Sequence, residues 1–376
     1  MNQNDIKMWT PTTTVLLLIM GAGGLVALYR MFFGLGAVTN LNSIWPWGFW
    51  IAFDVLGGVA MAAGGFIIAG AVYILNWKKY KPIVRPAVLN AFFGYLLAAI
   101  AIFLDIGQSF RIWHPMVMWQ VNSIMFIVAI HVVLYTSTLA AESSPMIFEK
   151  LKMTGLLNFM NKIMVPVVLF GVLLSTLHQS SLGAVYLIIP SKLSPLWYSS
   201  LLPYHFLVSA VLMGLSMVSF ETILSTRVFN HKPDMDILSG LAKGSLITVS
   251  LYLIMKLWDL VTVAGIGMAF TGSTSSNMYL LEMVIGVILP FILLISRDRR
   301  SNMRSIFSVN VLVIAGIVLN RMNVALFGLA DYAGKTGVDY FPSWMEFALT
   351  AGMVAFAILG FKVSVKYLNL FPEEAH

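Results

Sequence analysis

The chain has 376 residues, of which 59% are hydrophobic and only 10% are charged. Soluble domains carry about 25% charged residues, so this composition excludes a soluble globular protein, and its high hydrophobicity excludes a disordered one. The absence of cysteine excludes disulfides, thiolate metal sites and iron–sulfur clusters bound through cysteine. The net charge of +7 does not come from a basic stripe with interleaved aromatic residues, which argues against nucleic-acid binding.

Ten apolar stretches each approach the roughly 20 residues that a helix needs to cross a membrane. In chain order they predict helices at about 14–33, 47–75, 86–105, 116–141, 163–182, 201–226, 240–267, 278–296, 305–327 and 344–367. The segment 183–200 contains two prolines and predicts an interfacial or re-entrant loop. In the second stretch, small residues at four-residue spacing, such as Ala60 and Gly64, allow close helix crossing. We expect an all-α, polytopic integral membrane bundle, with residues 1–376 forming a single membrane domain.

Basic residues cluster at the termini and in the connections that follow the second, fourth, sixth and eighth helices. They are Lys7, Lys78, Lys79, Lys81, Arg85, Lys150, Lys152, Lys162, Arg227, Lys232, Lys243, Arg297, Arg299, Arg300, Arg304, Lys362 and Lys366. Because Lys and Arg are retained on the cytoplasmic side, we expect a bacterial inner-membrane protein with both termini in the cytoplasm. The opposite connections hold tryptophans, including Trp113, Trp197 and Trp344, whose plain interpretation is an interfacial aromatic belt.

Ionisable residues within the predicted spans are functional candidates, because a charge at a span centre costs roughly 2.5–3.5 kcal/mol on insertion scales. Most lie in the outer halves of their helices: Asp54, His178, His205, Lys256, Asp259, Glu282, Arg321 and Glu346. They predict a polar pocket that opens on the outer side. The alternative is that pairs such as Lys256–Asp259 and Arg321–Glu282 merely pin the helices together. His131 lies deeper, and Glu142 and Glu221 lie towards the cytoplasmic ends.

Histidines and carboxylates suit quinone chemistry, because they hydrogen-bond carbonyl groups and exchange protons near neutral pH. A di-haem cytochrome b-type anchor would need paired axial histidines, whereas only His131 is deep and His178 with His205 could form one outer pair at most. No HExxH motif or carboxylate–histidine cluster predicts a metal site. A plain anchor would not need the buried charges. A secondary transporter would more often show paired broken helices and an internal repeat.

Several motifs resemble the polysulfide-reductase/NrfD-like family of membrane subunits, most closely its HybB and Hmc-complex branch. They are WPWGFWIAFDVLGG (45–58), LHQSSLGAVYL (177–187), KLSPLWYSSLLP (192–203), GIVLNRMNV (316–324) and YFPSWMEF (340–347). The resemblance implies two four-helix bundles plus extra helices. It also implies a subunit, not catalytic alone and without haem or iron–sulfur clusters, that exchanges electrons with menaquinone or ubiquinone. Its implied partners are a ferredoxin-like iron–sulfur subunit on the periplasmic face and a Ni/Fe hydrogenase or multihaem cytochrome c.

The resemblance also suggests residue roles. His178 matches the family's candidate quinone-contacting histidine, and Asp54, Glu142 and Arg321 match charged residues of the second, fourth and ninth helices. Ile127 stands where relatives carry a glutamate, so protons would pass through His131 or not use that route. We expect a quinone site of His178, Asp54, Lys256, Asp259, Glu282 and Arg321, and a proton pathway of His131, Glu142 and Glu221. An ion-translocating subunit without its own quinone chemistry remains an alternative.

Overall fold

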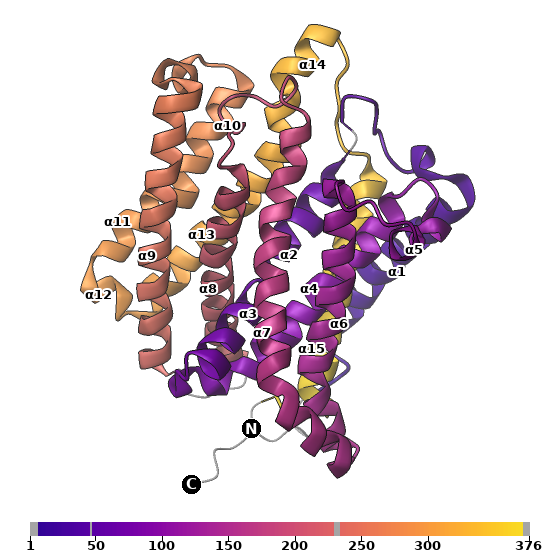
Figure 1. Ribbon diagram of the computed structural model, residues 1–376, viewed down its shortest axis with the longest axis vertical. Coiled ribbons are helices and arrows are strands. Elements are labelled where there is room, and N and C mark those ends of the chain that lie inside the picture. The colour runs from indigo at the N-terminus through magenta and orange to yellow at the C-terminus, as the bar shows by residue number, and fades with distance from the viewer. Residues whose placement is uncertain (1–6, 46, 229–233, 371–376) are drawn as a thin grey trace.

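The computed structural model describes residues 7–45, 47–228 and 234–370, so Pro46 and Lys232 lie outside the described residues. Ten helical stretches in this part of the chain are long and apolar enough to cross a membrane, which confirms the all-α polytopic fold (Figure 1). These spans are Pro11–Phe33, Ile51–Ile74, Lys78–Asp105, Ile124–Lys150, Thr154–Ile188, Leu202–Thr226, Met235–Ala264, Thr274–Ile295, Met303–Thr336 and Trp344–Tyr367.

The spans are built from α-helices interrupted by π-helical segments. The α-helices are α1 (Pro11–Phe33), α2 (Gly58–Met61), α3 (Gly64–Ala69), α4 (Val84–Asp105), α5 (His114–Val117), α6 (Ile124–Lys150), α7 (Thr154–Val185), α8 (Leu202–Val228), α9 (Met235–Asp259), α10 (Thr274–Glu282), α11 (Leu289–Ile295), α12 (Arg297–Arg300), α13 (Met303–Ala325), α14 (Ala330–Thr336) and α15 (Trp344–Tyr367). The π-helical segments are Ile51–Gly57, Gly70–Ile74, Leu260–Ala264 and Met283–Ile288.

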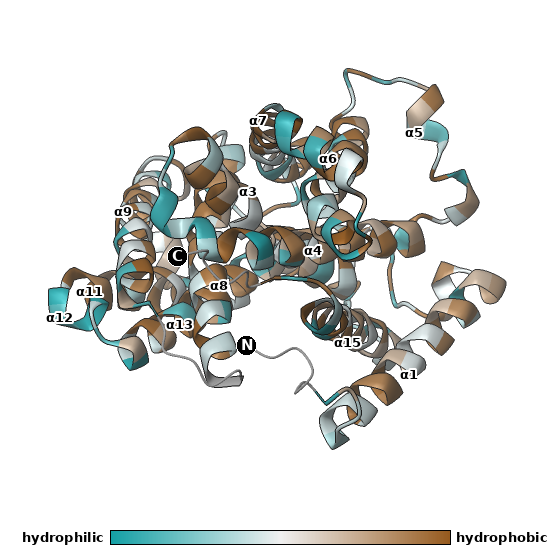
Figure 2. Cartoon of the chain, turned by 90° about the horizontal axis from the view of Figure 1, so that it is seen from below, coloured by the Kyte–Doolittle hydropathy of each residue, from teal (hydrophilic) through white to brown (hydrophobic). Residues whose placement is uncertain are grey.

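The spans form two groups of four and a flanking pair (Figures 1 and 2). The first bundle consists of the span 51–74 with α4, α6 and α7, and the second consists of α8, α9, the span 274–295 and α13. Helices α1 and α15 pack along each other and against α4. The span 51–74 also contacts α8 and α13, so it lies at the seam between the two bundles. This is the arrangement that the family resemblance implies.

The two ends of the bundle differ in character. The beginning of α1 and the end of α15 lie at one end, where Lys362 bonds Thr13, together with the basic connection that begins at Lys78 (Figure 1). We call this the basic end. The connections 34–50, 106–123, 189–201, 265–273 and 326–343 join the spans at the opposite end, where α14 protrudes, and we call this the loop-rich end.

Glycines let the helices approach to backbone contact at several crossings. A Cβ on Gly64 would lie 3.0 Å from the carbonyl oxygen of Gly214 on α8, and a Cβ on Gly316 would lie 2.0 Å from the Cα of Gly286. A Cβ on Gly65 would lie 2.5 Å from the Cβ of Ala91 on α4. The small residues of the second span therefore serve close helix crossing, as expected.

Two predicted helix ranges differ most from the structure at their ends. The span expected at 116–141 runs from Ile124 to Lys150, and the one expected at 163–182 begins at Thr154. Residues 116–121 are apolar but lie in a connection, and hydropathy does not separate the two cases. At the other end, α6 continues into polar sequence because Glu149 pairs with Arg85 at 2.5 Å. The loop predicted at 183–200 is only partly right: residues 183–188 continue the helical stretch that begins at Thr154, whereas 189–201 is a loop and not a span.

Candidate functional site

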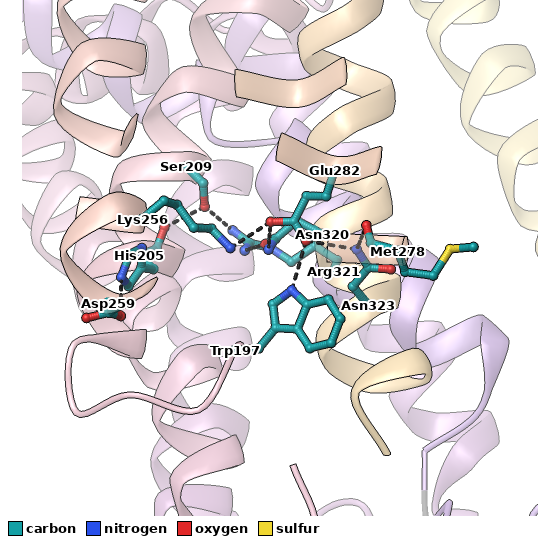
Figure 3. Close-up of polar contacts among 10 residues, drawn as sticks. All are labelled: Trp197, His205, Ser209, Lys256, Asp259, Met278, Glu282, Asn320, Arg321 and Asn323. Carbon is teal, nitrogen blue, oxygen red and sulfur yellow. Dashed lines mark hydrogen bonds and ion pairs between the residues drawn. The ribbon is translucent and has the colours of Figure 1, made fainter. Parts of the chain in front are cut away.

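The most completely bonded polar cluster lies in the second bundle, around the buried carboxylate of Glu282 at the end of α10 (Figure 3). Its Oε1 accepts hydrogen bonds from Lys256 Nζ on α9 at 2.6 Å and from Asn320 Nδ2 on α13 at 2.8 Å. Its Oε2 accepts from Trp197 Nε1 at 2.9 Å and from Asn323 Nδ2 at 2.8 Å. Four donors therefore replace water around one buried anion, as such a charge requires.

Arg321, the neighbour of Asn320, is buried in the same cluster without a carboxylate partner. One of its terminal nitrogens donates to Asn320 Oδ1 at 2.8 Å. The other donates to the carbonyl oxygen of Phe206 at 3.0 Å and to Ser209 Oγ at 2.8 Å. The guanidinium carbon also lies 3.8 Å from the centre of the Phe206 ring, a cation–π contact. We call Trp197, Lys256, Glu282, Asn320, Arg321 and Asn323 the Glu282 network.

A histidine–carboxylate pair borders this network. His205 Nε2 on α8 lies 2.7 Å from Asp259 Oδ2 at the end of α9, and the His205 ring packs edge-on against Tyr252. His205 Nδ1, Asp259 Oδ1 and the Tyr252 hydroxyl have no hydrogen-bond partner in the structure. The His205–Asp259 pair therefore still has polar atoms free to form hydrogen bonds, whereas most polar atoms of the Glu282 network are already bonded.

The charge pairs that sequence spacing suggested are not the pairs that form. Lys256 bonds Glu282 on a neighbouring span rather than Asp259 one turn away, and Arg321 reaches Glu282 only through Asn320. The interhelical partners prevail because Glu282 is enclosed and needs donors, whereas Asp259 has His205. The two cations and two carboxylates nevertheless balance in formal charge.

A second polar cluster occupies the first bundle, around His178 on α7. The side chain of His178 is fully buried, and neither of its ring nitrogens has a hydrogen-bond partner. Its ring lies 5.5 Å from that of Tyr95 on α4 and 6.1 Å from that of His131 on α6, measured between ring centres. His131 Nδ1 in turn lies 3.5 Å from Ser181 Oγ. The structure thus brings His131 and His178 together, although the sequence suggested different roles for them.

Further unpartnered polar groups continue from His178 towards the basic end. The rings of Tyr95 and Tyr135 meet edge-on at 4.5 Å between centres, with Ser175 close to both hydroxyls. None of these three hydroxyls has a direct hydrogen bond. Below them the carboxylate of Glu142 packs against Gly171, and its Oε2 is also unpartnered. We call His131, His178, Tyr95, Ser175, Tyr135 and Glu142 the His178 column.

The column ends at a cavity of about 60 Å³, near the basic end of the first bundle. Its lining includes Tyr73, Arg85, Glu142, Asn161 and Met164. The cavity is polar and large enough for more than one water molecule. Glu142 therefore connects the buried column to a space beside the basic end.

Asp54 and Glu221 lie apart from both clusters. Asp54, in the π-helical segment Ile51–Gly57, accepts a hydrogen bond from Thr350 Oγ1 on α15 at 2.7 Å. Glu221 on α8 contacts the Asn90 side chain of α4, which joins the two bundles. The polar groups predicted to form one outer pocket are therefore distributed over several separate places.

Glu346 has a structural role. It caps α15 by accepting from the backbone N–H of Ser343 and forms a capping box with that residue. It also accepts from the backbone N–H of Asn40 at 3.2 Å and contacts the hydroxyl of Tyr340. Burial and the contact with Glu346 raise the pKa of Tyr340 above its usual value. These bonds hold the connections 34–50 and 326–343 together at the loop-rich end.

Three acidic residues of the spans coincide with π-helical segments, which recur at functional sites because they reposition side chains locally. Asp54 lies within such a segment, and Asp259 and Glu282 each directly precede one. The wider turn frees backbone groups and changes the direction of the following helix face. These irregularities therefore mark the same acidic residues that the sequence singled out by their charge.

Several residues at these sites were not identified by sequence analysis. Trp197 was expected as an interfacial anchor, yet it is buried and donates to Glu282. Asn320 and Asn323 flank Arg321 in the motif GIVLNRMNV, and this local run of amides around a charge was the available signal. Tyr95 and Ser175 had none, because hydroxyl-bearing residues are common in membrane spans.

Comparisons with known proteins agree with the family resemblance. The model of the family described as "Polysulphide reductase, NrfD" matches residues 37–330. A protein of Nitratidesulfovibrio vulgaris is 35% identical over 98% of each chain. The "Probable Ni/Fe-hydrogenase 2 b-type cytochrome subunit" of Escherichia coli is 32% identical over 93% of this chain and 89% of its own. The "Menaquinone reductase, integral membrane subunit" of N. vulgaris is 30% identical over 94% and 90%. The chain therefore belongs to the NrfD family of polysulphide reductase membrane subunits.

Proposed function

We propose that this chain is the quinone-reactive membrane subunit of a respiratory complex, and that its quinone site lies at His178. The observation that carries the proposal is the fully buried His178 ring with two unpartnered nitrogens. A buried polar group without a partner costs about 1–3 kcal/mol, which a bound ligand or water would relieve. A neutral imidazole offers one donor and one acceptor, which match a quinone carbonyl and a quinol hydroxyl.

The neighbours of His178 suggest how a lipid-soluble substrate would reach it. His131 contacts His178 on one side and is itself only partly buried on α6. Two and three residues after it on the same helix, Val133 and Leu134 are exposed apolar side chains on the outer surface of the bundle. In a bilayer these side chains face lipid. We therefore propose that the head group approaches from the bilayer past α6.

Reduction of a quinone takes up two electrons and two protons, and the remaining predicted residues fit supporting roles. Asp54 and Asp259 each have a carboxylate that is not enclosed by cationic partners and would carry protons. Lys256, Glu282 and Arg321 are held in the closed Glu282 network and would set the local potential rather than contact the head group. In this proposal the head group binds in the first bundle, and the charged residues of the second bundle act on it from a distance.

A haem does not fit the histidine pair that the structure brings together. His131 and His178 have ring centres 6.1 Å apart with planes at 86°, and Tyr95 packs on the other side of His178. At this separation the two histidine rings leave no space between them for a macrocycle. His205 has its Nε2 bonded to Asp259. We therefore propose a haem-free subunit, although a relative is named a b-type cytochrome subunit.

We further propose an orientation and a docking side. The positive-inside rule would place the basic end and both termini in the cytoplasm of a bacterial inner membrane. The loop-rich end would then face the periplasm and receive a ferredoxin-like iron–sulfur subunit. That subunit would be supplied by a Ni/Fe hydrogenase or a multihaem cytochrome c. Relatives named as hydrogenase and menaquinone reductase subunits support this assembly.

The test is His178→Ala in the complete complex. We expect donor-dependent reduction of a quinone to be lost, while oxidation of the donor by a soluble dye, which does not need this subunit, continues. His114→Ala is the matched control, because His114 lies in the connection 106–123 outside the His178 column. Normal quinone reduction in an assembled His178→Ala complex would refute the site.

Proton uptake from the basic end is a second candidate function, favoured by the His178 column. Tyr95, Ser175, Tyr135 and Glu142 all present unpartnered polar atoms along one line that ends at the cavity. Unpartnered buried groups of this kind are commonly bridged by internal water. A hydrated column would carry protons from the basic end to a quinone at His178, with His131 in place of the glutamate that Ile127 replaces. Glu221, bonded to Asn90, would serve a separate branch.

Proton stoichiometry in sealed vesicles tests this function. We expect quinone reduction to move net charge across the membrane, and Glu142→Gln to slow turnover and remove that charge movement. Asp298→Asn is the control, because Asp298 is an exposed carboxylate at the same end. A proton-to-electron ratio without net transfer in the unaltered complex would exclude proton translocation while leaving the quinone site standing.

A further inference from the structure

The connection 106–123 between α4 and α6 extends sideways from the first bundle. It contains a short 3₁₀ turn at Ser109–Arg111 and the single-turn helix α5. Seen along the bundle, α5 lies well outside the ring of spans, beyond α6 and on the same side as α1 (Figure 2). Within this connection only Ser109 is buried. The connection therefore belongs to neither polar cluster.

Seven large apolar side chains of this connection are exposed. They are Phe110, Trp113, Met116, Val117, Met118, Trp119 and Val121, with Phe110 77% and Trp119 70% exposed. Arg111 is the single Lys, Arg, Asp or Glu among these 18 residues. The Trp119 indole nitrogen donates to the Met116 carbonyl oxygen at 2.9 Å, so the ring needs no outside hydrogen-bond acceptor. A patch of this kind marks a surface that is covered by something other than water.

The position of the connection indicates that lipid covers it. It leaves one span at Asp105 and enters the next at Ile124, so both of its ends lie at the same membrane surface. Its apolar surface continues directly onto α6, where Met125, Val133 and Leu134 are exposed and face the bilayer. Tryptophan beside arginine and histidine is typical of the headgroup region. In contrast, exposed charges that a peripheral protein could bind, such as Asp331, Lys335 and Asp339, lie on α14 and the connection after it.

We propose that the connection 106–123 is inserted in the lipid monolayer at the loop-rich end. Phe110, Val117 and Trp119 enter the boundary between headgroups and acyl chains, about 5–10 Å deep, as interfacial segments do. Arg111 remains at the headgroups, where it pairs with lipid phosphate. The inserted connection enlarges the lipid contact of the first bundle beyond its spans. This proposal does not depend on quinone chemistry or on any partner protein.

The natural absence of cysteine makes the test direct, because a single introduced cysteine reports one position. Val117→Cys carries an environment-sensitive fluorophore in the full chain, reconstituted in lipid nanodiscs alone and within its complex. Phe32→Cys on the exposed face of α1 is the lipid-facing control, and Asp339→Cys is the water-facing control. Nitroxide groups at shallow and deep positions on the lipid, and iodide in the water, serve as quenchers.

We expect the label at 117 to emit at shorter wavelength than the label at 339, and to be quenched by shallow nitroxides more than by iodide, with and without partners. Trp119→Cys should behave in the same way, which guards against a local effect of one label. Iodide quenching as strong as at 339 in both samples would overturn the proposal. Protection that exists only within the complex would also overturn it, because a partner protein would then be the cover.

Discussion

Glu282→Gln is the substitution that most directly tests the charge balance of the second bundle. Glu282 is the single carboxylate bonded to Lys256, whose Nζ also lies 5.6 Å and 5.4 Å from the ring centres of Tyr252 and Tyr279, in cation–π contact. A neutral glutamine would leave that ammonium charged in a dry site. Removing one partner of a buried ion pair costs about 3–5 kcal/mol. The glutamine amide would also place donors where Asn320 or Asn323 already donates. We therefore expect the free energy of unfolding to fall by an amount near the upper end of this range.

The reciprocal change should cost less. In Lys256→Met the carboxylate of Glu282 keeps three of its four donors, from Trp197, Asn320 and Asn323. We therefore expect Lys256→Met to destabilise less than Glu282→Gln. The double variant should lose less than the sum of the two, because neither leaves an unpaired charge once both are neutral.

Unfolding of the purified chain in mixed micelles, titrated with denaturing detergent, measures these free energies. Glu149→Gln is the matched control, because Glu149 pairs with Arg85 at the partly exposed basic end. Exposed pairs contribute about 0–1 kcal/mol. The reasoning is refuted if Glu282→Gln lowers the free energy of unfolding no more than Glu149→Gln does. It is also refuted if the double variant loses the sum of the two single losses, because Lys256 and Glu282 would then not be coupled.

Two further predictions concern the packing and bonding around the same network. Gly316→Ala places a methyl group 2.0 Å from the Cα of Gly286, where backbone cannot move aside. We therefore expect a loss of stability above the usual cost of overpacking, about 1–3 kcal/mol, and a lower melting temperature. Gly21→Ala is the control and should have little effect, because its methyl group meets nothing within 4 Å. Trp197→Phe keeps an aromatic ring but removes the N–H that is bonded to Glu282. We expect the free energy of unfolding in the same detergent titration to fall by about 1.5–3 kcal/mol. An unchanged midpoint would show that this hydrogen bond is dispensable.

Hydropathy predicted the spans well because a bilayer imposes one length on every crossing helix. It failed where sequence lies at the membrane surface. Residues 116–121 are mostly apolar but belong to an exposed connection, and α6 extends past the apolar run to Lys150. Length and hydropathy alone do not distinguish a helix from a loop that lies at the interface.

The polar residues were predictable as individuals but not as partners. Their cost in lipid identifies Lys256, Glu282 and Arg321 from charge alone. Their pairing depends on how α9, α10 and α13 are rotated, so Lys256 meets Glu282 across the bundle instead of Asp259 on its own helix. Asn320 complements these charges without a charge of its own, and a neutral amide is not identified by a search for charged residues.

The seam span 51–74 has a mechanical consequence for the whole chain. Gly64 touches the backbone of α8 on one side, and its neighbour Gly65 touches α4 on the other. The space beside Gly64 is already filled by the backbone of Gly214 and the side chain of Val218, so the two bundles have little room to shift where they meet. If a docked protein or a change of charge displaces the helices of one bundle, the helices of the other bundle must move with them or hold them in place. Any coupling between the His178 column and the Glu282 network would therefore pass through these rigid contacts. Substituting Gly64 or Gly65 with a larger residue is the way to interrupt it.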